Sequence, residues 1–212
     1  NSSEKKVNDK KVTDTVAATA TEKKLPNAHY KPAFEGQTRI KAVTTTTAYQ
    51  VEKIAEKMGR PWAIIALPDG KLLITEKSGF MEIHNADGAL VKKITGFPKV
   101  DDNGQGGLLD VALDPEFATN KTIYWSFSEK YGKGNLTAVA KGQLNENDSV
   151  IKNPKVIFRA TPELNSEYHF GSRLLFDKDG YLFVSSGERS VLEGRKQSQW
   201  LNSGMGKIFK IT

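Results

Sequence analysis

A chain of 212 residues that is 38% hydrophobic can bury an ordinary core, but it has no run of the roughly 18 apolar residues that a membrane span needs, so we predict no span. The absence of cysteine excludes disulfides, thiolate catalysis and Cys-ligated zinc. The net charge of +6 is dispersed without a basic stripe, and we predict no nucleic-acid partner.

The first 37 residues are rich in Lys, Ser, Thr and Glu, with almost no large apolar residue before Tyr30 and Phe34. Such a stretch cannot bury enough surface to offset the entropy lost on ordering. We therefore predict that residues 1–37 form a disordered polar tether. A tether of this kind suits a bacterial protein that is periplasmic or otherwise exported and held to a membrane through its N-terminus. An ordinary disordered tail is the alternative.

From about Thr38 the pattern changes to short β-rich runs broken by Gly, Asn, Asp and Pro, which is typical of hairpins. In Ala48–Met58 alone, apolar residues fall at helical spacing, and this segment is left open between helix and strand. We predict that residues 38–212 form one β-rich domain.

An internal repeat is the strongest sign of organisation in this domain. The segments WAIIALPDGKLLITEKSGFMEI, LLDVALDPEFATNKTIYWSFSE and RLLFDKDGYLFVSSGER each predict a strand, an acidic turn and a second strand. Aligning Leu67, Leu113 and Phe176 gives spacings of 46 and 63 residues. These are close to the period of about 40–50 residues of a propeller blade, with one longer connection.

Further strands are predicted between the repeats, at Phe80–His84, Leu90–Ile94, Leu136–Leu144 and Lys155–Arg159. Four short antiparallel strands per period make a β-propeller blade. A β-sandwich would also show alternating strands, but it does not explain why one unit returns three times. Roughly three blades cannot close a ring and would leave edge strands open. We therefore expect the remaining blades to lie outside this chain.

His169 and Glu188 are the strongest catalytic candidates, because they flank the third repeat at the same end of one hairpin. Imidazole serves as a general base near neutral pH, and a carboxylate on its other ring nitrogen fixes the tautomer. As alternatives, His169 is an ordinary loop residue, and Glu188 pairs with Arg189 or Arg173.

Gln105 lies in the segment Asn103–Asp110, where three glycines let the backbone approach a ligand closely. This segment precedes the second repeat as His169 precedes the third, so the two residues are predicted to be neighbours. The segment is not a phosphate loop, because it lacks a following Lys-Ser/Thr and a helix.

Several other polar and aromatic residues are assigned structural positions. We expect Asp177–Gly180 to form a turn rather than a calcium loop, since no spaced Glu completes one. His29 and His84 are predicted to be surface residues without a role. The tryptophans Trp62, Trp125 and Trp200 are predicted to be core aromatics, with the alternative that Trp200, beyond the third repeat, faces the central site.

With these motifs the sequence resembles the soluble PQQ-dependent sugar dehydrogenases, and the aldose sugar dehydrogenase branch most closely. The resemblance covers most of residues 60–211, in RPWAIIALPDGKLLITEKSG, GQGGLLDVALDPEFATNKTIYWSFSE, TAVAKGQL, VIFRATPEL, HFGSRLLFDKDGYLFVSSGER and GMGKIFKI.

The resemblance implies an all-β, six-bladed β-propeller of four-stranded antiparallel blades, with roughly the first three in this chain. It also implies oxidation of an aldose at the anomeric carbon to the lactone. His169 would take the hydroxyl proton while hydride passes to PQQ, and Glu188 would orient His169. Gln105 and His169 would contact both substrate and PQQ, and Tyr168 and Gln199 would be further sugar contacts.

The sequence also departs from the family pattern. Tyr168 stands where Asn or Asp is common, Ser172 replaces a common Gly, and residues 189–203, including Gln199, match loosely. The resemblance places the main ligands of PQQ and of calcium in later blades, so this chain has no predicted metal ligands and should be inactive alone. It further implies a small carrier or dye, rather than oxygen, as electron acceptor.

Two other functions remain open at this point. A calcium-dependent propeller lactonase or hydrolase would need converging acidic and Asn ligands in place of the Gln105 and His169 pair. In a non-catalytic propeller that acts as a binding module, His169 and Glu188 would be a structural pair.

Overall fold

In a computed structural model the chain divides into two compact units, Asn1–Glu52 and Lys53–Thr212, of which residues 29–31, 33–37, 45–145 and 147–211 are described. The described part of the first unit contains a turn in which the Gln37 N–H donates to the Phe34 carbonyl at 3.3 Å. Most of the predicted tether, residues 1–28, lies outside the described residues. The boundary at residue 37 stays a prediction.

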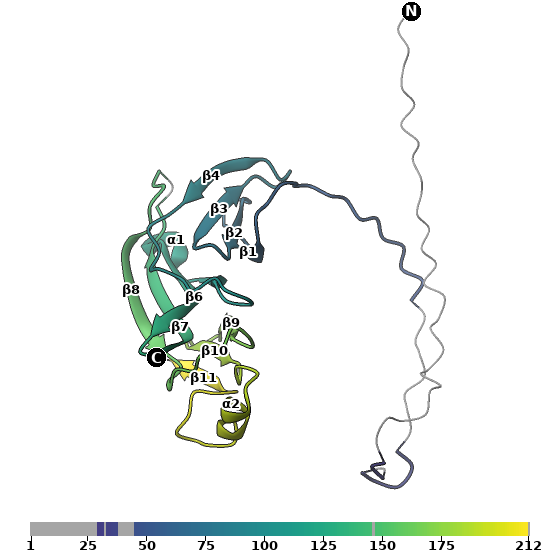
Figure 1. Ribbon diagram of the computed structural model, residues 1–212. Helices are drawn as coiled ribbons and strands as arrows, with labels where there is room; N and C mark the ends of the chain where they lie inside the picture. The colour runs from purple at the N-terminus through teal and green to yellow at the C-terminus, as the bar shows by residue number, and fades with distance from the viewer. Residues whose placement is uncertain (1–28, 32, 38–44, 146, 212) are drawn as a thin grey trace, which may run out of the picture. The chain divides into compact units, whose positions relative to one another are not determined.

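The described residues of the second unit form three antiparallel sheets (Figure 1). The first has the order β1 (Pro61–Ala66), β2 (Leu72–Glu76), β3 (Phe80–His84), β4 (Leu90–Ile94). The second has the order β5 (Leu108–Leu113), β6 (Thr122–Tyr131), β7 (Gly134–Gln143), β8 (Lys152–Arg159), with α1 (Phe117–Asn120) between β5 and β6. The third has the order β11 (Ile208–Ile211), β10 (Leu182–Ser186), β9 (Gly171–Phe176), with α2 (Leu192–Gln197) between β10 and β11.

The predicted strands agree closely with these elements. Phe80–His84 and Leu90–Ile94 are confirmed to the residue, and β7 and β8 each begin a few residues earlier than predicted. The expectation of strands soon after Thr38 finds no support in the described residues, since 45–58 contain neither strand nor helix. Val51 and Ile54 there are 83% and 45% exposed, so the segment offers no buried face on which a strand or helix would be stable.

The three sheets repeat one backbone pattern. The first strands, β1, β5 and β9, each carry a register shift against the second strand, between Pro61 and Ile64, Leu108 and Val111, and Gly171 and Leu174 respectively. This makes Ala66, Leu113 and Phe176 equivalent, so the alignment that used Leu67 was wrong by one residue. The error arose because an apolar Leu67 occupies the position that Asp114 and Asp177 hold in the later turns.

A buried hydroxyl links each sheet to the next. The Thr75 hydroxyl of β2 accepts the Ala63 N–H at 3.0 Å and donates to the Leu109 carbonyl of β5 at 2.6 Å. At the equivalent position of β6, the Ser126 hydroxyl accepts the Asp110 N–H at 3.0 Å and donates to the Ser172 carbonyl of β9 at 2.7 Å. The repeat seen in the sequence is therefore also a repeat of inter-sheet hydrogen bonds, as expected for propeller blades.

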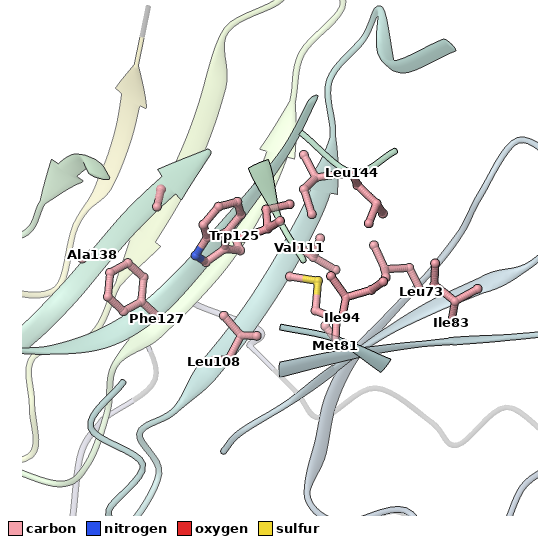
Figure 2. Packing of buried hydrophobic residues seen from close by; sticks show 14 of the residues in the cluster. Leu73, Met81, Ile83, Ile94, Leu108, Val111, Trp125, Phe127, Ala138 and Leu144 are labelled. Carbon is pink, nitrogen blue, oxygen red and sulfur yellow. The ribbon is translucent and has the colours of Figure 1, made fainter. Parts of the chain in front are cut away.

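The hydrophobic core lies between successive sheets. Figure 2 shows the larger cluster, which joins the first sheet to the second and contains Leu73, Met81, Ile94, Leu108, Trp125 and Phe127. A smaller cluster joins the second sheet to the third through Val139, Leu174, Leu182 and Val184. The all-β propeller prediction is confirmed by these three face-packed sheets.

The three tryptophans differ in burial. Trp125 is completely buried, with its ring edge-on to Phe97 at 5.0 Å between centroids, and its core assignment is confirmed. Trp62 is only partly buried against the core. Trp200 is 53% exposed and its core assignment is wrong, because it follows α2 in a turn and has no strand register to direct it inward.

Packing of the sheets brings the candidate loops together. β5 contacts β1 and β2 on one side, and β9 contacts β5 and β6 on the other. The loops that enter β5 and β9, which carry Gln105 and His169, therefore open at the same end of neighbouring strands.

Candidate active site

An open pocket of about 280 Å³ lies where these loops meet. It receives residues from all three sheets or the loops that flank them. Its lining consists of Trp62, Lys77, Gly104, Gln105, Leu109, His169, Phe170 and Gly171. Gln105 and His169 are therefore neighbours, as predicted, and both line the pocket.

The His169 imidazole is paired with Glu188. Its Nδ1 lies 2.7 Å from Oε1 and 3.0 Å from Oε2 of the carboxylate, which follows β10. Burial alone would raise the pKa of Glu188, but the hydrogen bond from His169 and backbone N–H groups lower it overall. The ionised carboxylate accepts a hydrogen bond from Nδ1–H, which leaves the lone pair of Nε2 in that tautomer to accept a proton.

The backbone around His169 is bent into an unusual shape. His169 has a φ of 49° and Gly171 a φ of 72°, both in the left-handed region. A Cβ on Gly187 would lie 1.9 Å from the His169 carbonyl oxygen, so only glycine permits this approach. The two ends of the β9–β10 hairpin come together here, and this brings Glu188 within reach of His169.

Gln105 holds the His169 loop through two hydrogen bonds. Its N–H donates to the Glu167 carbonyl at 2.8 Å, and its side-chain Oε1 accepts the His169 N–H at 2.8 Å. The glycine before it is needed for this contact, because a Cβ on Gly104 would lie 2.6 Å from the Glu167 Cβ. Oε1 is therefore engaged with the backbone, and the amide nitrogen is the part of Gln105 that remains to contact a ligand.

Lys77 and Trp62 are pocket residues that the sequence analysis missed as such. The Lys77 ammonium donates to the Gly104 carbonyl at 2.6 Å, and burial together with the nearby Arg60 lowers the pKa of Lys77. On Trp62, the Arg173 guanidinium lies 4.9 Å from the ring centroid. Lys77 directly follows the second strand of the first repeat and is equivalent to Ser128 and Gly187 in the later repeats. This position was the signal that could have identified it.

The alternative pairing of Glu188 with Arg189 or Arg173 is not observed. Arg173 donates to Asp110 at 2.9 Å, and burial raises the pKa of this aspartate. Arg189 is buried with its side chain directed to backbone carbonyls and to Asn135. Besides His169, the side chain of Arg195 lies beside Glu188, with its Nε 3.8 Å from Oε1.

The other predicted site residues lie apart from the pocket lining. Tyr168 is 51% exposed beside His169, and Gln199 is exposed in the turn after α2. Neither lines the pocket described above, and their roles as sugar contacts stay predictions.

The prediction that His84 is a surface residue is wrong, whereas His29 is exposed as expected. His84 is 5% exposed, with Nδ1 2.8 Å from the Gly88 carbonyl and Nε2 2.9 Å from Glu82. The turn that follows β3 folds back over the ring and buries it, which a strand pattern alone does not reveal. His84 lies outside the pocket lining.

The residues at the pocket fit a planar, aromatic, anionic ligand and do not fit a metal ion. The partly buried Trp62 offers aromatic surface, Lys77 offers a positive charge, and no carboxylate is among the lining residues described. In the described part of the chain, no three His, Asp or Glu side chains gather as metal ligands. The Asp177 carboxylate, considered for calcium, instead accepts the N–H groups of Asp179 and Tyr181 at 2.9 Å, which confirms the turn.

No helix in the described residues is long and apolar enough to cross a membrane.

Comparison with known proteins gives a consistent assignment. Residues 58–212 match the family model described as Glucose / Sorbosone dehydrogenase. The aldose sugar dehydrogenase YliI of Escherichia coli is 39% identical over 164 residues, which are 76% of this chain and 43% of that protein.

Two solved structures agree with the observed fold. The apo-form of the soluble aldose sugar dehydrogenase from Escherichia coli superposes with a TM-score of 0.71 at 38% identity, over 76% of this chain and 46% of that one. The PQQ-bound aldose sugar dehydrogenase from Streptomyces coelicolor gives 0.67 at 25% identity, over 76% and 47%. The chain spans about half the length of these relatives. It belongs to the glucose/sorbosone dehydrogenase family, that of the PQQ-dependent sugar dehydrogenases.

Proposed function

We propose that the full-length protein oxidises aldose sugars at the anomeric carbon to the lactone with PQQ, and that this chain carries the catalytic base. The observation that supports this most directly is the 2.7 Å contact between His169 Nδ1 and Glu188 at the edge of a pocket. A histidine held in this way is poised to act as a base through its other nitrogen.

In the proposed reaction, His169 Nε2 accepts the proton of the anomeric hydroxyl. The ionised Glu188 keeps Nδ1 protonated and stabilises the imidazolium that forms. PQQ, when bound, supplies the acceptor for the hydride and its two electrons, and the anomeric carbon becomes the lactone carbonyl. Gln105 holds the backbone of the base, and its amide nitrogen is left to donate to a sugar oxygen.

This chain offers PQQ an incomplete site. Lys77 would attract a carboxylate of the cofactor, and Trp62 would offer a flat apolar surface. The remaining blades would supply the other PQQ ligands and any calcium site, so this chain alone is expected to be inactive. Export to the periplasm and transfer of electrons to a small carrier or dye belong to the same proposal.

The test is dye reduction by the full-length protein, loaded with PQQ and calcium, against a panel of aldoses. Replacing the base in His169→Gln should lower kcat by a factor of about 100 to 10,000, the usual contribution of a general base, with PQQ binding retained. His29→Gln is the matched control, because it removes an exposed imidazole outside the pocket. Unchanged turnover in His169→Gln would exclude the assigned base.

The alternatives predict different outcomes in the same assay. A calcium-dependent lactonase would hydrolyse lactones without reducing the dye, and the pocket lining offers no carboxylates for its metal. A non-catalytic binding module would bind a sugar without turnover, and His169→Gln would leave that binding intact.

A further inference from the structure

Arg189 is a buried charged side chain next to Glu188, and the reaction above does not use it. The residue is 1% exposed, although it directly follows Glu188 in the chain. Burial lowers the pKa of Arg189 to about 10, an effect that Asp101 opposes. At neutral pH it therefore remains a cation inside the protein, which is costly unless its donors are satisfied.

Two of the side-chain hydrogen bonds of Arg189 go to the segment that carries His169. Its Nε donates to the Tyr168 carbonyl at 3.0 Å and its Nη2 to the Ser166 carbonyl at 2.5 Å. The guanidinium also lies 3.9 Å from the centroid of the Phe170 ring. The side chain therefore contacts the residues on both sides of His169.

The backbone of Arg189 reinforces these contacts. Its N–H donates to the His169 carbonyl at 3.3 Å, and its carbonyl accepts the Ser166 hydroxyl. Arg189 and Ser190 both have positive φ, 67° and 59°, so the chain is held in a conformation that non-glycine residues avoid. Arg189 therefore links the end of β10, where Glu188 lies, to the loop that carries His169.

The charge is balanced at a distance rather than by a direct ion pair. Nη1 and Nη2 bond the carbonyl and the side-chain oxygen of Asn135, at 3.0 and 2.5 Å. The Asn135 amide nitrogen in turn donates to Asp101 at 2.9 Å. This arrangement leaves the geometry of Arg189 set by fixed carbonyls of the loop and of β7.

We propose that Arg189 is a positioning residue, which holds the loop of His169 against the strand exit of Glu188 so that the pair keeps its hydrogen bond. The inference rests on the proposed function, since it concerns the orientation of the base. A planar guanidinium donates to several carbonyls at once. The compact ammonium group of a lysine cannot reproduce this arrangement. Arg189 would therefore act through His169 and would not touch the substrate.

The experiment compares Arg189→Lys with Arg159→Lys in the full-length protein. Arg159 is the matched control because it binds one surface carboxylate, that of Glu129, at 2.6 and 2.9 Å. We expect Arg189→Lys to lower kcat at least tenfold at 25 °C, with a smaller change in KM and with PQQ bound. We expect the control to keep wild-type kcat.

A second measurement does not depend on turnover. The ¹⁵N shifts of the His169 ring, assigned by their loss in His169→Gln, report whether Nδ1 carries the proton. The proposal predicts one tautomer in the wild type and a mixture in Arg189→Lys. If the wild-type protein oxidises no aldose, the proposed function fails, while these shifts still decide whether Arg189 positions His169.

A milder variant guards against loss of folding. Ser166→Ala removes the hydroxyl that donates to the Arg189 carbonyl and accepts the Tyr168 N–H at 3.3 Å, and leaves the guanidinium in place. Ser166→Ala should change the tautomer balance and kcat in the same direction as Arg189→Lys does, but by a smaller amount. Folded Arg189→Lys and Ser166→Ala proteins with wild-type kcat and wild-type ring shifts would show that Arg189 only stabilises the fold, and would overturn the proposal.

Discussion

The side-chain oxygen of Gln105 accepts the backbone N–H of His169 at 2.8 Å, across the boundary between the second and third sheets. The residues are 64 positions apart, and each lies in the loop that enters the first strand of its sheet. Gln105 is thereby tied to the backbone of the proposed base as well as to the pocket.

Two substitutions of Gln105 separate these roles. Gln105→Ala removes the acceptor for the His169 N–H, and a misplaced base is expected to lower kcat by about tenfold to a hundredfold. Gln105→Glu keeps an acceptor oxygen but loses the amide donor, so kcat should fall less while KM for the aldose rises. Steady-state kinetics of the PQQ-loaded protein measure both. Equal kcat losses in the two variants would show that the contact to His169 does not matter.

Ser172→Gly should stabilise the protein. Ser172 has a φ of 87°, is completely buried, and its hydroxyl has no hydrogen-bond partner among the described residues. Glycine removes the left-handed strain of about 1–2 kcal/mol, less the greater freedom of glycine in the unfolded chain, for a net gain of about 0.5–1 kcal/mol. Urea denaturation measures the change, and Ser172→Ala, which keeps the Cβ, should gain less. A destabilised Ser172→Gly would refute the strain argument.

His84 should make stability depend on pH. Burial alone lowers the pKa of His84, but its hydrogen bonds to Gly88 and Glu82 raise it overall. A pKa raised on folding stabilises the folded state fully below the unfolded value of about 6.5, and this stabilisation is lost as the pH rises through the folded-state pKa.

The Glu82→Gln variant tests the effect of pH on His84, because it removes the charge opposite Nε2. The free energy of unfolding, measured from pH 5 to pH 8, should fall more steeply in the wild type than in the variant. The two proteins should therefore differ most at low pH. Parallel curves would mean that the pair does not contribute.

The hydroxyl that links the second sheet to the third should be needed for stability. Ser126→Ala leaves the Asp110 N–H and the Ser172 carbonyl without their buried partner, at a cost of about 2–4 kcal/mol. Ser126→Thr restores the hydroxyl, as Thr75 does at the equivalent position of β2, and should recover most of the loss. Thermal unfolding of the two variants measures the difference. Equal stability of Ser126→Ala and wild type would contradict the inter-sheet role.

The strands and turns could be predicted because their signals are local. Met81 and Ile83 on either side of Glu82 indicate a strand, and the aspartate and glycine of Asp177–Gly180 indicate a turn, from neighbouring residues alone. The repeat of this unit then predicted the blades. The pairing of His169 with Glu188 was also within reach, because both flank one hairpin.

Tertiary packing decided which partner each polar side chain chose. Arg189 lies beside Glu188 in the sequence but turns to the carbonyls of another loop, and His84 is buried by its own turn. Gln105 and Lys77 meet at the pocket only because β5 packs against β1 and β2. Local pattern determines which face of a strand is apolar, whereas the hydrogen bonds of a buried donor depend on which distant carbonyls the packed sheets bring within 3 Å of it.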